Sequence, residues 1–281
     1  MNTRPTRPGD GPFTERTPRV VAARALTRRA GRDKAGRFLA EGAQAVREAL
    51  RWAAEGRGRV HEVFVTDPSG DLAAAATEAG VRVSTVTDRA AAGLSETVTP
   101  QGIVAVCDLL DVPLANALAG SPALVAVLVG VADPGNAGTV IRVADAAGAD
   151  AVLLAGHTVD PHNGKCVRAS TGSIFHLPIA RAASVPDVLA ACRDAGLELV
   201  AADGYATEDV ESATPAAPTA WVFGSEAHGL PAEVLESVDR ALRVPLYGGA
   251  ESLNLATAAA VCLYATAWRR RRDQREGISG R

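Results

Sequence analysis

The chain has 281 residues, enough for two ordinary domains, and 47% of them are apolar whereas only 4% are aromatic. This composition indicates a packed globular protein and excludes an intrinsically disordered one. No run of about eighteen apolar residues predicts a membrane span, and the arginine-rich N-terminus lacks the apolar segment of a secretory signal. We therefore expect a cytoplasmic protein that does not enter a membrane.

The charges are distributed unevenly around a net charge of −3. Residues 1–37 carry ten Lys or Arg and three acids, residues 269–281 carry six Arg and two acids, and the segment between them carries 13 basic and 27 acidic residues. Basic terminal segments beside an acidic middle segment are typical of arms that bind phosphates. Terminal segments that are simply solvated and disordered would show the same charge pattern. We expect a disordered basic arm at 1–17 and a basic tail at 271–281, and we leave RNA contact by Arg19–Arg37 open.

The cysteines and histidines do not predict a metal site. The four cysteines show no C-x-x-C pair and are scattered along the chain, at Cys107, Cys166, Cys192 and Cys262. We expect them to be reduced and mostly buried. His157 and His162 lie close in sequence, but a histidine pair in a loop is usually an ordinary surface feature, so no metal is expected.

The first ordered part, at 18–107, alternates short strands and helices, which predicts a small α/β unit. Val20–Ala30 is predicted to be one helix with Arg24, Arg28 and Arg29 on its exposed side. Strands are expected at 38–41, 61–66, 81–86 and 103–107, and helices at 43–55, 72–79 and 88–94. Residues 108–122 contain two prolines and no strong periodicity, so we interpret them as a linker.

The second unit begins with an apolar run at 123–131, which is typical of a central parallel strand covered on both faces. Asn136 is expected to cap a helix from Ala137 to Ala147, and Gly148 is expected to end it. Further strands are expected at 151–154, 177–179, 198–202, 220–223 and 242–244, and helices at 163–169, 184–196 and 253–268. The last helix is apolar almost all round, so we expect it to be largely buried.

A first candidate motif, Asn136-Ala-Gly-Thr-Val-Ile-Arg142, opens the first helix of this unit. Arg142 follows Asn136 by six residues, about 9 Å along a helix. Helical side chains lean toward the N-terminus, so its guanidinium could hold a phosphate near the helix start, or it could be an ordinary surface arginine. The sequence lacks the G-x-G-x-x-G of a dinucleotide site and the Gly-Lys-Ser/Thr of a P-loop.

Two more candidate loops follow predicted strands. Gly224-Ser225-Glu226 comes directly after one, where Glu226 could either cap a turn or bind a ligand. Pro245 ends the other, and a glycine-rich loop leads to Ser252, which we expect to cap the last helix. Asn254, expected at the second helical position, is a polar residue where an apolar one would pack, which suggests hydrogen bonding across a site.

In combination, these stretches resemble the SpoU–TrmH family of RNA ribose 2′-O-methyltransferases. The family's N-x-G-x-x-x-R occurs at 136–142, its G-x-E-x-x-G at 224–229, and its I-P-x-x-G-x-x-x-S-L-N at 244–254, with Val244 in place of Ile. Residues 167–172 match a further family segment, and 36–42 resemble the start of the L30e-like domain that many members carry.

The resemblance implies an α/β fold with a SPOUT-type parallel sheet and a C-terminal trefoil knot over residues 123–270, preceded by an L30e-like RNA substrate-binding domain at 18–107. It implies S-adenosyl-L-methionine as the cofactor, held by main-chain groups of Gly224, Val244 and Leu253. It also implies a homodimer in which the last helix is partly covered by its twin.

The implied reaction is methyl transfer to a ribose 2′-oxygen in structured RNA, with 23S ribosomal RNA favoured over transfer RNA. Arg142 is the expected central residue, and because a guanidinium with a pKa above about 12 is a poor base, we favour phosphate positioning over proton abstraction. The remaining expected catalytic residues are Asn136, Glu226, Ser252 and Asn254. A tRNA substrate, a catalytically silent RNA-binding member and an enzyme that methylates a base stay open as alternatives.

Overall fold

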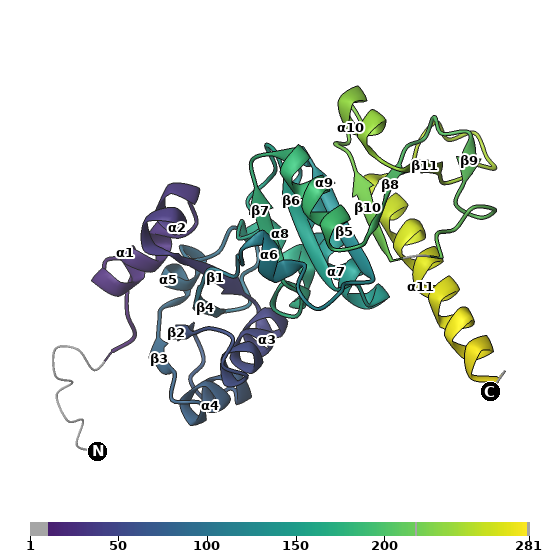
Figure 1. Cartoon of the computed structure of the whole chain (residues 1–281). Helices are drawn as coiled ribbons and strands as arrows, with labels where there is room; N and C mark the ends of the chain where they lie inside the picture. The colour runs from purple at the N-terminus through teal and green to yellow at the C-terminus, as the bar shows by residue number, and fades with distance from the viewer. Residues whose placement is uncertain (1–10, 217, 280–281) are drawn as a thin grey trace, which may run out of the picture. The chain divides into compact units, whose positions relative to one another are not determined.

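The computed structural model describes residues 11–216 and 218–279, and it divides the chain into two compact units (Figure 1). Unit 1 comprises the residues up to Leu109 together with His162–Phe175, and unit 2 comprises Leu110–Pro161 together with the residues from His176 onward. The segment predicted to be catalytic, 123–270, thus contains a piece that belongs to unit 1. None of the described helices is long and apolar enough to cross a membrane.

Unit 1 is built on a four-stranded sheet in the order β1-β4-β2-β3. Its strands are β1 (Arg37–Glu41), β2 (Val60–Val65), β3 (Arg82–Thr85) and β4 (Ile103–Asp108). Strand β4 is antiparallel to both β1 and β2, whereas β3 is parallel to β2. Its helices are α1 (Pro18–Ala25), α2 (Arg29–Ala35), α3 (Ala43–Ala54), α4 (Asp71–Glu78), α5 (Asp88–Ala92) and, from later in the chain, α8 (Gly164–Ser170) with the short 3-10 helix η1 (Ser173–Phe175).

The prediction of a single helix at 20–30 was wrong, because the chain breaks between α1 and α2. The buried Arg32 guanidinium donates to the carbonyl oxygens of Leu26 and Thr27, both at 3.0 Å, and so satisfies carbonyls that a continuous helix would have bonded internally. Gly31 permits the tight return, since a Cβ there would lie 2.0 Å from the Ala25 carbonyl oxygen.

Residues 11–17 differ from the predicted disordered arm, whose first ten residues lie outside the described part of the chain. Phe13 forms a parallel bridge with Val86, donating its amide to Thr85 and accepting from Thr87. The Arg19 guanidinium lies 4.6 Å from the centre of the Phe13 ring, a cation–π contact that holds the segment against α1.

The segment His162–Phe175 packs within unit 1 through aromatic and ionic contacts. The ring of Phe38 on β1 lies 4.8 Å from that of His162 and 5.9 Å from that of Phe175. Arg168 on α8 donates to the carboxylate of the buried Glu41 at 3.0 Å. These contacts join residues more than a hundred positions apart in sequence, which periodicity alone does not reveal.

Unit 2 contains a seven-stranded sheet in the order β7-β6-β5-β10-β8-β11-β9, and every neighbouring pair in it is parallel. The strands are β5 (Leu124–Val129), β6 (Ala151–Ala155), β7 (Ile179–Ala182), β8 (Glu198–Ala202), β9 (Glu208–Asp209), β10 (Thr219–Phe223) and β11 (Arg240–Arg243). The helices are α6 (Leu114–Ala117), α7 (Pro134–Ala147), α9 (Val185–Asp194), α10 (Ala232–Ser237) and α11 (Leu255–Ser279). The predicted parallel α/β sheet is confirmed.

The central strands are buried on both faces, as their apolar runs predict. No residue of β5 is more than 5% exposed. Consecutive residues of a strand point to opposite faces of the sheet. On β10, Val222 belongs to the core cluster that includes Leu189 of α9. The preceding residue, Trp221, donates its indole N–H to Thr266 of α11 at 2.9 Å. Helices therefore cover both faces of the sheet at β10.

Helix α11 differs from the largely buried helix that was predicted. It extends to Ser279, so the expected basic tail is helical over its described part. Its inner face packs against α7, where the Tyr264 hydroxyl donates to the Ala146 carbonyl at 3.3 Å. Its outer face leaves Val261 39% and Trp268 62% exposed in the single chain.

Candidate active site

The three predicted motifs all follow the carboxyl ends of parallel strands in unit 2. The first follows β5, the second follows β10, and the third follows β11. Strands β5 and β10 are neighbours at the point where the strand order changes direction, with β6 and β7 on one side and β8, β11 and β9 on the other. Such switch points are where open α/β sheets bind ligands, because the loops diverge there and leave a crevice.

The first motif begins α7 three residues earlier than predicted. Asp133, not Asn136, is the N-cap. Its carboxylate accepts a hydrogen bond of 2.8 Å from the main-chain N–H of Asn136, and Pro134 occupies the first helical position. Asp133 was not among the predicted caps, although Asp followed by Pro is a helix-start signal. With the cap supplied by Asp133, the Asn136 side chain bonds elsewhere.

Asn136, Glu226 and Asn254 form a continuous hydrogen-bonded chain, which we call the Asn–Glu relay. The Asn136 side-chain amide donates to a Glu226 carboxylate oxygen at 2.6 Å, and the Asn254 amide donates to the Asn136 oxygen at 3.0 Å. The partners are 90 and 118 positions apart in sequence. The relay therefore ties together the three motif loops.

Asn254 also caps α11, where the prediction assigned Ser252. The Asn254 side-chain oxygen accepts from the amides of Ala256 at 2.9 Å and Thr257 at 3.3 Å, so Asn254 precedes the helix instead of lying within it. Because its oxygen faces two donors, its NH2 group must face Asn136, and this sets the direction of every bond in the relay. Ser252 is exposed and makes no side-chain hydrogen bond to another described residue.

Glu226 lies in a tight hairpin that depends on glycine. The Ser225 and Gly229 main chains exchange hydrogen bonds of 3.0 and 2.9 Å, and the Ser225 hydroxyl accepts from the His228 amide at 3.3 Å. A Cβ on Gly224 would lie 2.2 Å from the Gly229 carbonyl carbon, so only glycine fits. The Ser225 hydroxyl thus supports the turn, while the Glu226 carboxylate bonds to Asn136.

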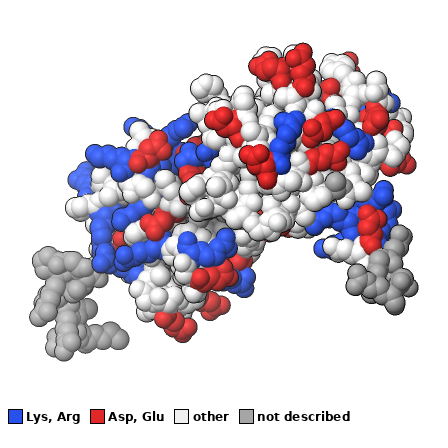
Figure 2. All heavy atoms as spheres, in the orientation of Figure 1, with Lys and Arg blue, Asp and Glu red and all other residues white. Residues whose placement is uncertain are grey.

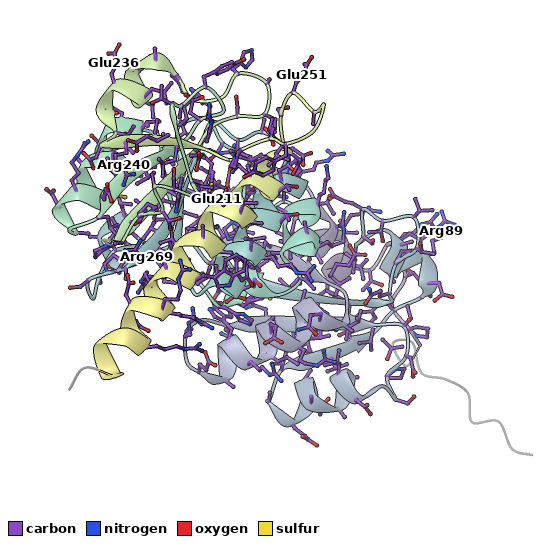
Figure 3. The ribbon with its side chains drawn as sticks, turned by 90° about the vertical axis from the view of Figure 1, so that its right-hand side faces the viewer. Arg89, Glu211, Glu236, Arg240, Glu251 and Arg269 are labelled. Atoms are coloured by element: carbon purple, nitrogen blue, oxygen red, sulfur yellow. The ribbon has the colours of Figure 1, made fainter. Side chains whose placement is uncertain are left out.

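The third loop, residues 244–253, is exposed over most of its length. Figure 3 shows Glu251 on this loop, with its side chain directed away from the start of α11. The Tyr247 hydroxyl donates to Glu211 at 2.8 Å, and that hydrogen bond to a carboxylate raises the pKa of Tyr247. The amides of 246–253 donate no hydrogen bond to another described residue, so they are available to a ligand.

The remaining predicted residues have separate positions. Arg142 is exposed on α7, about 1.7 turns beyond Asn136. Of the three residues expected to hold a cofactor, Gly224 is buried, Val244 is half-buried and Leu253 is exposed. The structure thus joins Asn136, Glu226 and Asn254 directly.

Residues 11–216 and 218–279 show neither a cluster of metal-binding side chains nor an exposed cysteine. No group of three His, Cys, Asp or Glu there is arranged to hold a metal ion. All four cysteines are buried and outside disulfides, and burial raises the pKa of the Cys192 and Cys262 thiols to about 12. These thiols therefore stay protonated at neutral pH and are poor nucleophiles.

Family models match both parts of the chain. The model of the SpoU rRNA Methylase family matches residues 123–264, and the model of the MRM3-like substrate binding domain matches residues 17–105. The first match includes all three motifs of the candidate site.

Individual proteins of known identity or structure agree. The chain is 38% identical over 236 residues to the 23S rRNA (guanosine(2553)-2′-O)-methyltransferase RlmP of Bacillus subtilis, which covers 83% of this chain and 89% of that protein. The crystal structure of an AdoMet-bound rRNA methyltransferase from Sinorhizobium meliloti has a TM-score of 0.80 and 32% identity, covering 93% of this chain and 98% of that one. The SpoU methyltransferase AviRb from Streptomyces viridochromogenes, in complex with AdoMet, has a TM-score of 0.80 and 30% identity, covering 91% and 98%. The family predicted from the motifs is confirmed, and this chain belongs to the SpoU rRNA methylase family.

Proposed function

We propose that this protein transfers a methyl group from S-adenosyl-L-methionine to the 2′-oxygen of a ribose in 23S ribosomal RNA. The observation that carries the proposal is the Asn–Glu relay, which brings the three family motifs into one site at the switch point of the sheet. Family membership and the names of the relatives support the reaction and the RNA class.

The loops of unit 2 fit such a cofactor. Gly224 lets the hairpin main chain approach closely, and the unbonded amides of 246–253 can pair with the adenine and the amino-acid end of the molecule. Main-chain groups of Gly224, Val244 and Leu253 would hold it. When bound, the cofactor supplies an electrophilic methyl group on its sulfonium sulfur.

The protein's own residues then have to orient the ribose and balance charge. Arg142, exposed on α7, would bind the phosphate next to the target ribose and so position the 2′-hydroxyl. The 2′-oxygen would gain the methyl group while its proton passes to solvent water. The Asn–Glu relay holds the three motif loops in one arrangement around the reacting groups, and Ser252, exposed in the third loop, would add a hydroxyl to the site. No metal takes part in this proposal.

Unit 1 would bind the RNA substrate as an L30e-like domain, in keeping with the match to the MRM3-like substrate binding domain. We assign residues 18–107 to that domain and 123–270 to the catalytic domain, with the fragment at 162–175 packed on the former. The trefoil knot implied by the resemblance would lie in the C-terminal part, whose last helix returns to pack on α7 after β11. We propose a cytoplasmic protein, because that is where its proposed ribosomal RNA substrate would be met.

A second copy of the chain would cover the exposed face of α11. Val261 and Trp268 are 39% and 62% exposed on this helix, and Leu253, just before it, is 36% exposed. Large apolar side chains gathered on one exposed face indicate an interaction surface. A homodimer through α11 would remove them from water.

The test is transfer of a tritiated methyl group from the cofactor to transcripts of 23S rRNA, with total tRNA as the comparison substrate. Nuclease digestion and mass spectrometry then identify the modified nucleoside, and calorimetry measures cofactor binding separately. We expect a 2′-O-methyl nucleoside from 23S rRNA. A base-methylated product, methyl transfer to tRNA alone, or no cofactor binding would each contradict the proposal.

A further inference from the structure

Three arginines lie at one end of the strands in the unit 1 sheet. Because β4 is antiparallel to β1 and β2, and β3 is parallel to β2, the strands β1, β2 and β3 begin at the same edge. Arg37 is the first residue of β1, Arg82 is the first of β3, and Arg59 immediately precedes β2. With about 4.8 Å between neighbouring strands, the four strands set these arginines across about 14 Å.

These arginines line one hollow of about 960 Å³, and α1 forms another of its walls through Arg19 and Ala22, with Leu26 just after the helix. The hollow contains a single carboxylate, that of Glu62, and this is already neutralised. Glu62 is 8% exposed, pairs with Arg19 at 3.1 Å, and accepts from the Ser84 hydroxyl at 2.6 Å.

The other three arginines of the hollow form no ion pair within the described chain, so their charges can attract a ligand. Arg37, Arg59 and Arg82 are exposed, and none of them forms an ion pair with another residue of the described chain. The neighbouring carboxylate of Asp108 is held by His61 at 2.5 Å. In Figure 2, basic side chains gather over the α1–α2 side of unit 1. Three solvated guanidinium groups at one rim attract several phosphates at once.

The floor of the hollow is apolar, unlike its rim. Leu26, Val60, Phe64 and Val106 contribute to it, and each is less than a tenth exposed. The volume is at the upper end of the range of ligand pockets, about 300–1,000 Å³, and so exceeds what one phosphate needs. Arginines around an apolar floor suit an unpaired nucleotide, whose base packs against the floor while its phosphates meet the rim. A paired helix would present its phosphates but could not fill the floor.

We infer that this hollow binds an unpaired segment of the RNA substrate, with Arg37, Arg59 and Arg82 on its phosphates. The inference rests on the RNA substrate of the proposed function and adds where unit 1 holds it and in which form.

The experiment compares two double variants of the full-length protein. Arg59→Gln with Arg82→Gln removes two charges from the rim, and Arg47→Gln with Arg89→Gln removes two exposed charges of unit 1 outside the hollow. Filter binding to a 23S rRNA transcript is measured from 50 to 300 mM KCl, and circular dichroism melting checks that both variants fold. Each phosphate contact on a single strand contributes about 0.7 to the slope of log affinity against log salt concentration. The slope of the rim variant (Arg59→Gln with Arg82→Gln) should therefore fall by about 1.4, and its affinity should fall about tenfold. The slope of the matched variant (Arg47→Gln with Arg89→Gln) should fall by less than about 0.5.

A second measurement separates unpaired from paired RNA. The rim variant should lose at least tenfold in affinity for an unstructured uridine 20-mer and less than threefold for a 20-base-pair RNA duplex. Equal losses for the two RNAs, equal salt slopes for the two double variants, or unchanged binding by the rim variant would each overturn the inference. Methyl transfer by the wild-type protein is measured in parallel, so a protein that binds through the rim but transfers no methyl group would refute the proposed reaction and leave the hollow assignment standing.

Discussion

The double role of Asn254 allows a prediction that separates stability from catalysis. Asn254→Ala removes the cap of α11, worth about 1 kcal/mol, and an exposed amide hydrogen bond to Asn136, worth about 0.5–1 kcal/mol. The free energy of unfolding should fall by about 1.5–2 kcal/mol, which lowers the melting temperature of unit 2 by about 3–7 °C.

Asn254→Asp separates the two roles. Aspartate keeps the oxygen that accepts from Ala256 and Thr257, and its negative charge suits a helix N-terminus, so the cap survives. The donor to Asn136 is lost, and Asn136 can then turn its own amide away from Glu226. We expect a melting temperature within about 2 °C of wild type but a kcat for methyl transfer reduced about 100-fold, because a small misplacement of positioning groups costs that much.

Scanning calorimetry and a tritiated-methyl assay at saturating RNA measure the two effects. Ser252→Ala is the matched control for the cap alone, and it should leave the melting temperature unchanged because Ser252 caps nothing in the described chain. Wild-type kcat in Asn254→Asp would refute the relay. A larger loss of melting temperature in Ser252→Ala than in Asn254→Ala would refute the cap assignment.

Three further changes test the rest of the site. Arg142→Ala should lower kcat at least 100-fold and leave cofactor affinity in calorimetry unchanged, with Arg142→Lys in between; loss of cofactor binding would instead place the residue in the cradle. Gly224→Ala puts a Cβ 2.2 Å from the hairpin main chain, so the hairpin must move. The affinity for the cofactor, measured by calorimetry, should fall at least tenfold (about 1.4 kcal/mol). Unchanged affinity would contradict a close approach of the cofactor to this hairpin. Val261→Glu with Trp268→Glu should halve the mass measured by light scattering, and a mass equal to wild type would refute a dimer through α11.

Much of the fold follows from local patterns. The apolar run at 124–129 becomes the central strand β5 because a stretch without polar side chains can be buried on both faces. The helix from Val185 begins where Ser184 accepts from the Asp187 amide, as the Ser-Val-Pro-Asp pattern predicts. Patterns of this kind depend on residues a few positions apart, and these the sequence displays directly.

The sequence by itself determined the family and the parallel sheet and predicted the residues of the candidate site, since motif residues keep their spacing whatever the fold does with them. Only the tertiary structure decided which of those residues bond: Asn254, not Ser252, caps α11, because its oxygen meets two helix amides while its amide faces Asn136, 118 positions away. It also decided that the fragment at 162–175 packs on unit 1 and that Arg32 interrupts the first helix. The physical reason is the same in each case, because the direction of a hydrogen bond or the burial of a ring depends on atoms brought together from distant parts of the chain.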